Sequence, residues 1–312
     1  MRRVVVEGGS GYAGMELVRL PARHPDFSLC AVTSSRWAGS TVRQRLGLPG
    51  PVGELVFQPQ TDAADVDGVF LATPDPVSEA LAPRWLGSGA RVVDLSRAFR
   101  ADPKGVYGLT ELHRAAIDNA ALVANPGCYP TAAQLALVPL LEAGLLAPGP
   151  IVIDAKSGVS GAGRRLDDSL LFNELADNHY PYRVGDHPHV AEIERGIGRE
   201  VLFTPHLLPT RRGLLDTIYA PLATGVTPAE VAACWAERYA NEPFVFVATP
   251  DAAVGLRAVI HTPNCHLAVG PTVKSGMVRL FASLDNLLKG AASQALQNMN
   301  RMLGSTETAG LI

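Results

Sequence analysis

Short apolar, β-branched runs alternate with helical patterns through the N-terminal part of the chain. Three of the apolar runs read VVVEG at residues 4–8, DGVFLATP at 67–74 and ARVVDLSR at 90–97. Strands that are apolar along their whole length are buried on both faces, as in parallel sheets covered by crossover helices. The pattern therefore predicts an α/β fold built on a doubly wound parallel sheet. Pro21 lies inside the first helical pattern and is expected to kink or shorten that helix.

A second domain is expected to begin at residue 128. A helical pattern over about residues 130–143 leads into longer strand patterns, among them REVLFTPHLL and GLLDTIYAPLA, together with a glycine-rich loop and a histidine-containing segment. This mixture indicates an α+β domain with a mixed sheet over residues 128–285. The closing helical pattern must pack on another element, and we place it on the first domain, which then comprises residues 1–127 and 286–312.

The charge balance indicates a small-molecule partner. The 312 residues carry a formal net charge of −3 with both signs interspersed, so neither a nucleic acid nor an anionic membrane surface is expected to bind. No apolar run approaches the ~20 residues of a membrane-spanning helix, and the N-terminus has no apolar targeting segment. The four cysteines are far apart and form no CxxC pair, which fits a reducing cytoplasm and gives no disulfide framework.

A glycine-rich loop follows the first apolar run and opens the first helical pattern. Glycines at such a point let the backbone approach a pyrophosphate, which then binds the unpaired amides of the helix N-terminus. The alternative is a turn that needs glycine only for close packing of the helix on the sheet. The residues expected to contact a dinucleotide are Gly8, Ser10, Gly11, Tyr12, Ala13 and Gly14.

The end of the second strand pattern bears on which dinucleotide would bind. A ribose 2′-hydroxyl usually pairs with an acidic residue there, about 20 residues past the glycine loop. This chain has Ser34, Ser35 and Arg36 instead. Hydroxyl groups and a guanidinium suit a 2′-phosphate, so NADP is favoured over NAD. The alternative is a solvated turn with an ordinary surface arginine.

Cys128 is the candidate nucleophile. It lies in NPGCYPTA, residues 125–132, where a proline and a glycine end a strand pattern and a second proline lies near a helix start. The N-terminus of a helix favours a thiolate, which is the reactive form of the side chain. A lone cysteine is more often a small buried hydrophobe, and we assign that role to Cys30, Cys234 and Cys265.

A base for this thiol is available in HPHVAEIE, residues 187–194. Glycine and proline around His187 and His189 indicate a loop or helix start, from which side chains can reach a cleft. A metal site built on these two histidines and Glu192 is the rival interpretation. No further ligand cluster accompanies them in the sequence, so no metal is expected.

Eight motifs occur in the same order as in one known family. They are GGSGYAGMEL, DLSRAFR, VYGLTEL, ANPGCYPTAAQLALVPLLEAG, DAKSGVSGAGR, HPHVAEIE, FTPHLLPTRRG and DNLLKGAASQALQ. Together they resemble the N-acetyl-γ-glutamyl-phosphate reductases of arginine biosynthesis. The wider group includes aspartate-semialdehyde dehydrogenase and the aminoadipyl-phosphate reductase of lysine biosynthesis. NPGCYPT is the arginine-pathway form of the cysteine motif.

The resemblance implies a Rossmann-type NADP-binding domain, a catalytic and dimerisation domain, and the chemistry of a phosphorylating semialdehyde dehydrogenase. Cys128 would attack the acyl phosphate and form a thioester, which NADPH would reduce to the semialdehyde. His189 corresponds to the family's acid/base, and His187 and Tyr182 correspond to substrate contacts. A homo-oligomer, dimer or tetramer, is implied as well.

Two arginines and a set of polar residues take further roles from the same resemblance. Arg100 resembles the family's phosphate-side arginine, and Arg212 occupies the arginine position of its motif. For both, a surface or structural ion pair is the alternative. Lys289 has the alternative of a surface charge at a helix start. The further cofactor contacts implied are Ser157, Gly158, Ser160, Gly161, Asn286 and Lys289.

One position departs from the family pattern. The resemblance implies an arginine between the paired histidines, where this chain has Pro188. The five N–H donors of a guanidinium are therefore missing from that position. Three alternatives stay open: the same chemistry on an aminoadipyl or carrier-linked acyl phosphate, a non-catalytic NADP-binding regulatory protein, and a metal-dependent hydrolase.

Overall fold

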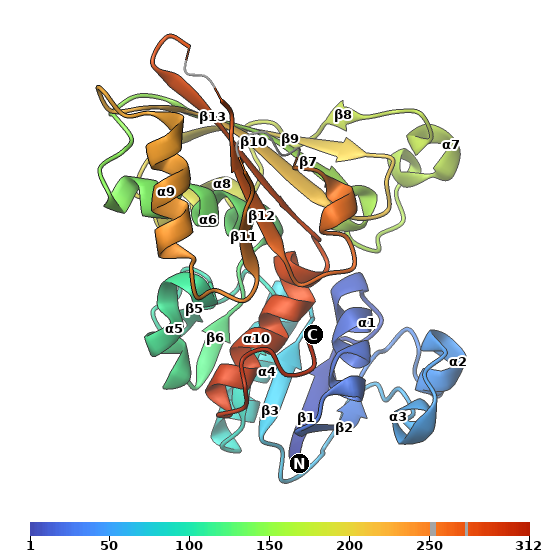
Figure 1. Ribbon diagram of the computed structural model, residues 1–312. Helices are drawn as coiled ribbons and strands as arrows, with labels where there is room; N and C mark the ends of the chain where they lie inside the picture. Colours follow the sequence, from blue (N-terminus) through green and yellow to red (C-terminus); the bar gives the residue numbers. More distant parts are fainter. Residues whose placement is uncertain (250–253, 272–273) are drawn as a thin grey trace. The chain divides into compact units, whose positions relative to one another are not determined.

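The computed structural model describes residues 1–249, 254–271 and 274–312, which form two compact units (Figure 1). Unit 1 comprises Met1–Pro126 and Ala291–Ile312, and unit 2 comprises Gly127–Gly290. The expected crossings, at residues 128 and 286, lie close to these divisions. The chain returns to unit 1 later than expected, after Gly290. Asp285 accepts hydrogen bonds from the backbone of Leu287 and Leu288, which ties the segment after it to unit 2.

The sheet of unit 1 has six strands in the order β2-β1-β3-β4-β6-β5, and every pair of neighbours runs parallel. Val4 and Val6 face a core cluster that includes residues of the first and last helices, whereas Val5 faces a second cluster on the other side of the sheet. This two-sided burial is why the strands are apolar along their length, and it confirms the predicted doubly wound fold. The strands are β1 (Arg2–Glu7), β2 (Phe27–Val32), β3 (Gly68–Leu71), β4 (Arg91–Asp94), β5 (Val106–Tyr107) and β6 (Leu122–Ala124).

Six α-helices accompany this sheet among the described residues: α1 (Tyr12–Arg19), α2 (Val42–Leu46), α3 (Gly50–Glu54), α4 (Asp75–Gly87), α5 (Thr110–Asp118) and α10 (Ser293–Met302). The first helix ends at Arg19 and gives way to a 3-10 turn over Pro21–Arg23, so Pro21 shortens it as predicted. A π-helical turn, Leu288–Ala292, precedes α10. The final helix packs on α5 and β4, as Figure 1 shows.

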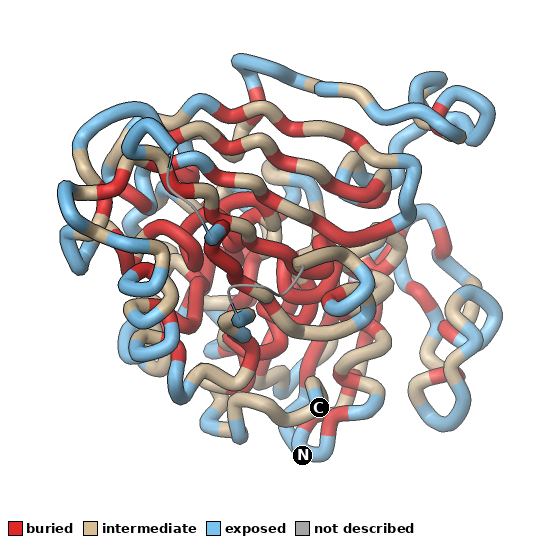
Figure 2. Tube along the Cα trace, turned by 45° about the horizontal axis from the view of Figure 1, so that its top comes forward, coloured by how far each residue is buried: buried red, intermediate tan, exposed pale blue. Residues whose placement is uncertain are grey.

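Unit 2 is built on a mixed sheet of seven strands in the order β11-β12-β13-β10-β7-β9-β8. Burial alternates along β7, where Ile151, Ile153 and Ala155 are buried and the residues between them are partly exposed. Figure 2 shows this alternation along the strands of the sheet. The strands are β7 (Ile151–Gly158), β8 (Tyr180–Pro181), β9 (Val201–Leu208), β10 (Leu214–Pro221), β11 (Val245–Val247), β12 (Cys265–Val269) and β13 (Met277–Leu284).

Three helices cover one face of this sheet: α6 (Cys128–Glu142), α8 (His189–Ile197) and α9 (Pro228–Arg238). The central helix, α6, is almost entirely buried and contacts both of the others. Trp235 of α9 donates from its indole N–H to the carbonyl oxygen of Ala136, which joins these two helices. The other face carries exposed apolar side chains, Leu202, Tyr219 and Phe246.

A long excursion between β7 and α8 contains short elements only: η2 (Val159–Ala162), η3 (Asp168–Leu170), α7 (Phe172–Leu175) and β8. Most of its residues after Ala162 are exposed, and Figure 2 shows them in pale blue. A further 3-10 turn, η4 (Leu256–Ala258), lies in the later part of unit 2. Within residues 1–249, 254–271 and 274–312, no helix has both the length and the apolar character needed to span a bilayer.

Candidate active site

Cys128 is the first residue of α6, as the proline and glycine around it predict. Gly127, the N-cap residue, has an extended backbone with φ −70° and ψ 158°. Its carbonyl oxygen accepts the first hydrogen bond of the helix, from the N–H of Thr131 at 2.9 Å. The N–H groups of a first helical turn carry partial positive charge, so the sulfur lies where negative charge is stabilised.

His189 is the first residue of α8, the helix that packs against α6. Its imidazole lies on Gly127: a Cβ atom added to that glycine would be 2.7 Å from Cε1 of the ring and closer still to Nε2. Glu192, one turn further along α8, accepts a hydrogen bond from the N–H of Gly127 at 2.9 Å. The start of one helix is thereby tied to the start of the other, which places Cys128 and His189 at the same end of the helix pair.

His187 belongs to a chain of hydrogen bonds that fixes its tautomer. Its Nδ1 accepts from the backbone N–H of His189 at 3.2 Å, so the proton of the neutral ring lies on Nε2. Nε2 lies 3.4 Å from the hydroxyl of Tyr182, which in turn donates to the hydroxyl of Tyr129 at 3.4 Å. Burial, with a smaller contribution from the charge of Arg183, lowers the pKa of His187 to about 4. The imidazole is therefore neutral near pH 7.

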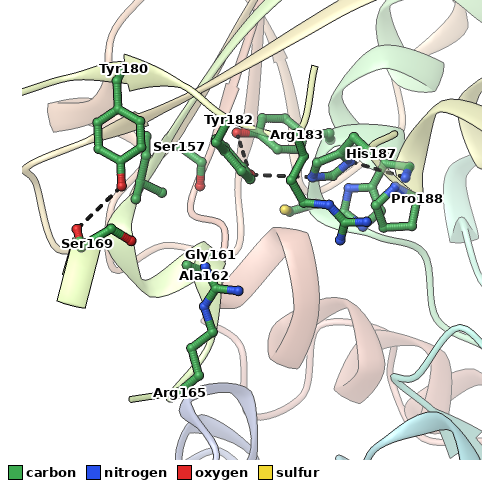
Figure 3. Close-up of a pocket in the computed structure, with 14 residues that line it drawn as sticks. Ser157, Gly161, Ala162, Arg165, Ser169, Tyr180, Tyr182, Arg183, His187 and Pro188 are labelled. Atoms are coloured by element: carbon green, nitrogen blue, oxygen red, sulfur yellow. Dashed lines mark hydrogen bonds between the residues drawn. The ribbon is translucent and has the colours of Figure 1, made fainter. Parts of the chain in front are cut away.

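These side chains line a cavity of about 300 Å³, drawn in Figure 3. The cavity brings together six residues that the sequence predicts for the site: Cys128, Ser157, Gly161, Tyr182, His187 and His189. Other lining residues were not predicted for the site: Tyr129, Ala162, Arg165, Ser169, Tyr180, Arg183, Pro188 and Leu207. Tyr129 follows the cysteine directly and Arg183 follows Tyr182, so adjacency to predicted residues was the available signal.

Tyr129 and Tyr182 are held as neutral phenols. Burial, the main cause, raises the pKa of Tyr182 to about 12 and that of Tyr129 well above its usual range. The Tyr129 ring packs edge-on to both His187 and His189, with centroid distances of 5.7 and 5.8 Å. This aromatic contact fixes the plane of both imidazoles next to the cysteine.

Asp216 of β10 is a fully buried carboxyl on the helix-covered face of the same sheet. Neither of its oxygens has a hydrogen-bond partner among the described residues. Burial raises its pKa well above the usual range, while the charge of Lys156 acts in the opposite direction. Its field also contributes, as the smallest cause, to the raised pKa of Tyr129. Sequence reasoning did not single out this residue.

The glycine-rich loop after β7 packs tightly against the segment around Arg212. A Cβ atom on Gly158 would lie 2.7 Å from the Arg212 backbone, so only glycine fits there. Asn286 is buried and bridges the two segments: its Nδ2 donates to Ser160 at 2.9 Å, and its Oδ1 accepts from the N–H of Gly213 at 2.8 Å. The structure therefore gives Asn286 a role in holding the loop.

Lys289 and Arg212 are both buried. Lys289 is fully enclosed with its Nζ 5.8 Å from the ring centre of Phe244, which excludes the alternative of a surface charge. Arg212 pairs with Asp285 at 3.3 Å and contacts Nδ1 of His261 at 2.8 Å. It is not among the residues that line the cavity. The structural ion pair, named as an alternative for Arg212, is thus present.

In unit 1, the glycine loop has the close approaches that a dinucleotide loop needs. Gly8 has φ +87°, and a Cβ atom there would lie 2.8 Å from the carbonyl carbon of Ala72. A Cβ on Gly14 would lie 3.1 Å from the carbonyl carbon of Gly8 and closer to its oxygen. Gly11 is the N-cap of α1, and no side chain caps that helix. The backbone amides at the start of α1 are therefore presented as an anion-binding surface.

The end of β2 carries the residues expected at a ribose phosphate. Ser34 donates from its hydroxyl to Ser10 in the glycine loop at 2.8 Å and accepts from the N–H of Trp37 at 3.2 Å. Ser35 and Arg36 are exposed. Glu7, the acidic residue nearby, is buried and already accepts from Thr33 and from the indole of Trp85. These residues fit a 2′-phosphate better than a bare ribose, so the loop and the turn together suit NADP.

Arg100 also lies in unit 1, half-buried after β4. Its guanidinium donates to the carbonyl oxygens of Asn125 at 2.9 Å and Leu95 at 3.0 Å. The arginine thus braces the end of β6 just before the cysteine segment. Within the described residues there is no cluster of three or more histidine, cysteine, aspartate or glutamate side chains that could hold a metal.

Comparison with known families covers both units. Residues 3–120 match the family described as semialdehyde dehydrogenase, NAD binding domain. Residues 128–286 match the family described as semialdehyde dehydrogenase, dimerisation domain.

Curated relatives match the chain along its whole length. An N-acetyl-gamma-glutamyl-phosphate reductase of Halorhodospira halophila is 41% identical over 339 residues, covering 100% of this chain and 98% of that protein. One of Thiobacillus denitrificans is 42% identical over 338 residues, with the same coverage. Among solved structures, aspartate semialdehyde dehydrogenase II from Vibrio cholerae has a TM-score of 0.79 at 18% identity, over 97% of this chain and 99% of that one. An aspartate semialdehyde dehydrogenase with NADP from Candida albicans has a TM-score of 0.75 at 15% identity, over 98% and 99%.

Proposed function

This chain belongs to the semialdehyde dehydrogenase family, beside the N-acetyl-gamma-glutamyl-phosphate reductases, and from that premise we propose the reaction and the residues that perform it. The protein is an NADP-dependent oxidoreductase that reduces N-acetyl-γ-glutamyl phosphate to N-acetylglutamate semialdehyde and phosphate in arginine biosynthesis. One observation carries the assignment of roles: Cys128 and His189 each begin a helix, and both line one cavity.

Cys128 acts as the nucleophile. Its sulfur attacks the γ-carbonyl carbon, the bond from that carbon to the phosphate oxygen breaks, and phosphate leaves with the bonding electrons. The product is a thioester on Cys128. The position at the start of α6 favours the thiolate before the attack and the oxyanion that forms on addition.

NADPH, when bound, supplies the hydride that reduces the thioester carbon. His189 takes the thiol proton before the attack and returns a proton when the carbon–sulfur bond breaks and the semialdehyde is released. Its ring is placed for this by Gly127 beneath it and by Tyr129 at its edge. His187 and Tyr182, both neutral near pH 7, contact the substrate from the same wall of the cavity.

Three sets of residues are proposed to hold NADP. The glycine loop, with Ser10, Tyr12 and Ala13 between its glycines, holds the pyrophosphate on the amides of α1. Ser34, Ser35 and Arg36 hold the 2′-phosphate. Asn286 contributes by fixing the loop that contains Ser157, Gly158, Ser160 and Gly161. Arg100, Arg212 and Lys289 act from within the fold: Arg100 braces the end of β6, Arg212 pairs with Asp285, and Lys289 lies over the ring of Phe244.

We further propose a cytoplasmic homo-oligomer. The open face of the unit 2 sheet exposes Leu202, Tyr219 and Phe246, and burying such a patch against a second copy would remove it from water. The family description that matches this unit names a dimerisation domain, which supports association through this unit. Sedimentation of the Leu202→Glu variant tests it: a shift to monomer is expected.

The reverse reaction tests the proposed function. The protein is incubated with N-acetylglutamate semialdehyde, inorganic phosphate and NADP, and reduced nicotinamide is followed by absorbance. Phosphate-dependent reduction is expected, and the Cys128→Ala variant should lose at least about 10³-fold in rate. Cys234→Ala, on the half-buried side of α9, is the matched control and should keep the wild-type rate.

The same assay tests which acyl group the enzyme prefers. Side-by-side specificity constants for N-acetylglutamate semialdehyde and for an aminoadipate semialdehyde derivative should favour the former. A well-folded, NADP-binding wild type with no phosphate-dependent reduction of either substrate would contradict the proposed function.

A further inference from the structure

The proposed reaction places a phosphate group in the cavity at Cys128, and this inference rests on that function. A phosphate dianion needs cationic donors close to it. The histidine at position 187 does not supply the charge, because it is neutral near pH 7. The cationic side chains among the residues that line the cavity are Arg165 and Arg183.

Of these two arginines, Arg183 is the one that lies on the side of the cavity formed by His187 and Pro188. It directly follows Tyr182, which bonds His187, and its charge acts on that imidazole. Figure 3 shows its guanidinium near His187 and Pro188, while Arg165 enters the cavity from below in that view. Arg165 is paired with Asp167 at 3.1 Å, in the exposed excursion.

The backbone of Arg183 is in a conformation that arginine rarely adopts. Its φ is +48°, in the left-handed region that favours glycine. Gly185, two residues on, also has a positive φ, of +85°, so the chain turns sharply between Tyr182 and His187. Strained residues of this kind persist where the surrounding structure holds them, and they cluster at ligand-binding sites.

Asp186 holds the guanidinium in place across this turn. Nη2 of Arg183 donates to the backbone carbonyl of Asp186 at 3.0 Å and lies 3.3 Å from its carboxylate. Both contacts use Nη2, so they leave Nε and Nη1 to an anion. The side chain of Arg183 is 49% exposed, which keeps those donors accessible to a ligand that enters the cavity.

Pro188 lines the same cavity, at the position where the sequence resemblance implies an arginine. We propose that Arg183 binds the phosphate of the substrate and supplies, from the preceding turn, the guanidinium that position 188 lacks. Arg183 is a binding residue in this proposal: it holds the phosphate next to the N-terminus of α6, where Cys128 lies, and takes no part in proton transfer.

Phosphate kinetics in the reverse reaction test the proposal. Arg183→Gln removes the charge and should raise the KM for phosphate about 10- to 100-fold, with less than about a twofold change in the KM for the semialdehyde and for NADP. Arg183→Lys keeps the charge without the fork and should give an intermediate KM. Arg195→Gln, an exposed site on α8, makes the same charge change and should leave all three constants unchanged.

A second substitution separates loss of phosphate binding from damage to the fold. In the double variant Arg183→Gln with Pro188→Arg, the guanidinium returns to the same wall of the cavity, so the KM for phosphate should recover at least several-fold. A normal phosphate KM in Arg183→Gln would overturn the proposal, and so would an equal rise in all three constants that Pro188→Arg does not reverse.

Alkylation of Cys128 by iodoacetamide gives a readout that does not require turnover. Inorganic phosphate should slow alkylation of the Cys128 peptide in the wild type, and about 10-fold more phosphate should be needed in Arg183→Gln. If the wild type shows no turnover but phosphate protects its Cys128 at lower concentration than in Arg183→Gln, phosphate binding by Arg183 is supported and the proposed reaction is contradicted. Equal protection in both proteins would overturn the role of Arg183 alone.

Discussion

The imidazole of His189 packs directly on the α-carbon of Gly127. A Cβ atom built there would lie 2.7 Å from Cε1 and 2.9 Å from Cδ2 of the ring, with Nε2 closer than either. The residue that precedes the nucleophile therefore also determines where the base lies. Because its backbone is in the ordinary extended region, alanine would fit the chain at this position but not the space beside it.

Gly127→Ala is expected to displace the imidazole of His189 and to lower kcat about 10- to 100-fold, since a misplacement of about 1 Å has effects of that size. The unfolding midpoint should stay near that of the wild type. The matched control is Gly87→Ala, an exposed helical site where an added Cβ meets nothing within 4 Å, and it should retain full activity. Wild-type kcat in Gly127→Ala would show that the base does not need this position.

Glu192→Ala should lower both stability and activity. It leaves the buried N–H of Gly127 without its acceptor, which costs about 1–3 kcal/mol of unfolding free energy, and it releases the start of α6 from α8. Glu192→Gln keeps an oxygen at the same place and should lose less than half as much. Denaturant unfolding and kcat of the three proteins check this, and equal losses in both variants would contradict it.

His187 predicts a loss of stability in acid. Its pKa of about 4 in the folded protein lies below the unfolded value of about 6.5, so the unfolded chain binds more protons between these two values. Stability from this group is complete above about pH 6.5 and is lost as the pH falls toward 4. Wild type should lose about 2 kcal/mol more than His187→Gln between pH 7 and 4, allowing for solvent screening. Parallel unfolding curves for the two proteins over that window would refute this.

Arg36→Ala should weaken NADP binding about 10-fold and leave NAD binding unchanged, because one charge-assisted contact to a phosphate is worth about 1.5–3 kcal/mol before solvent exposure is considered. Fluorescence titration of both dinucleotides measures the ratio. Arg23→Ala, at an exposed site in the 3-10 turn after α1, removes the same charge and should change neither affinity. A parallel loss of NAD and NADP would mean that Arg36 does not read the 2′-phosphate.

Asp216 predicts the opposite pH dependence from that of His187. Its raised pKa means that the folded protein keeps a proton which the unfolded chain gives up above about pH 4, so stability falls as pH rises through that range. Asp216→Asn cannot ionise and should unfold at a higher temperature than wild type at pH 8, by roughly 2–4 °C for each kcal/mol gained. The difference should shrink toward pH 4. A gain independent of pH would point to packing instead.

Much of the fold follows from local pattern. The run from Val4 to Val6 faces cores on both sides of the sheet. Apolar and polar residues therefore do not alternate in it, and this is the sequence signal that indicates a parallel sheet. The helix start at Cys128 follows from local residues too, because proline and glycine act on their own backbone. The end of unit 2 does not, since it depends on Asp285 capping the turn that follows and pairing with Arg212. The two-residue strands β5 and β8 have no pattern of their own and exist through their neighbours.

The candidate site divides in the same way. Cys128 and His189 are recognisable because each lies beside residues that end or begin an element. Glu192, considered in the sequence as a metal ligand, accepts from Gly127 only because α8 packs on α6. Arg183 lines the cavity from a turn in which its backbone has a positive φ, and residue type gives no sign of that conformation. The interior ion pair of Arg212 likewise joins residues far apart in the sequence.

In each unit, the two points at which the chain crosses to the other unit lie close together. In unit 1 the side chain of Asn125 donates to the carbonyl oxygen of Ala291 at 3.2 Å, so the strand that leaves and the helix that returns are already joined. In unit 2 a Cβ atom on Gly290 would lie 2.6 Å from Cβ of Cys128, so the beginning and the end of this unit are adjacent. Domains are inserted into host loops most readily where such ends coincide. In genetic terms, one insertion at a single point of a dinucleotide-binding ancestor suffices to introduce the thiol, its base and the sheet behind them together.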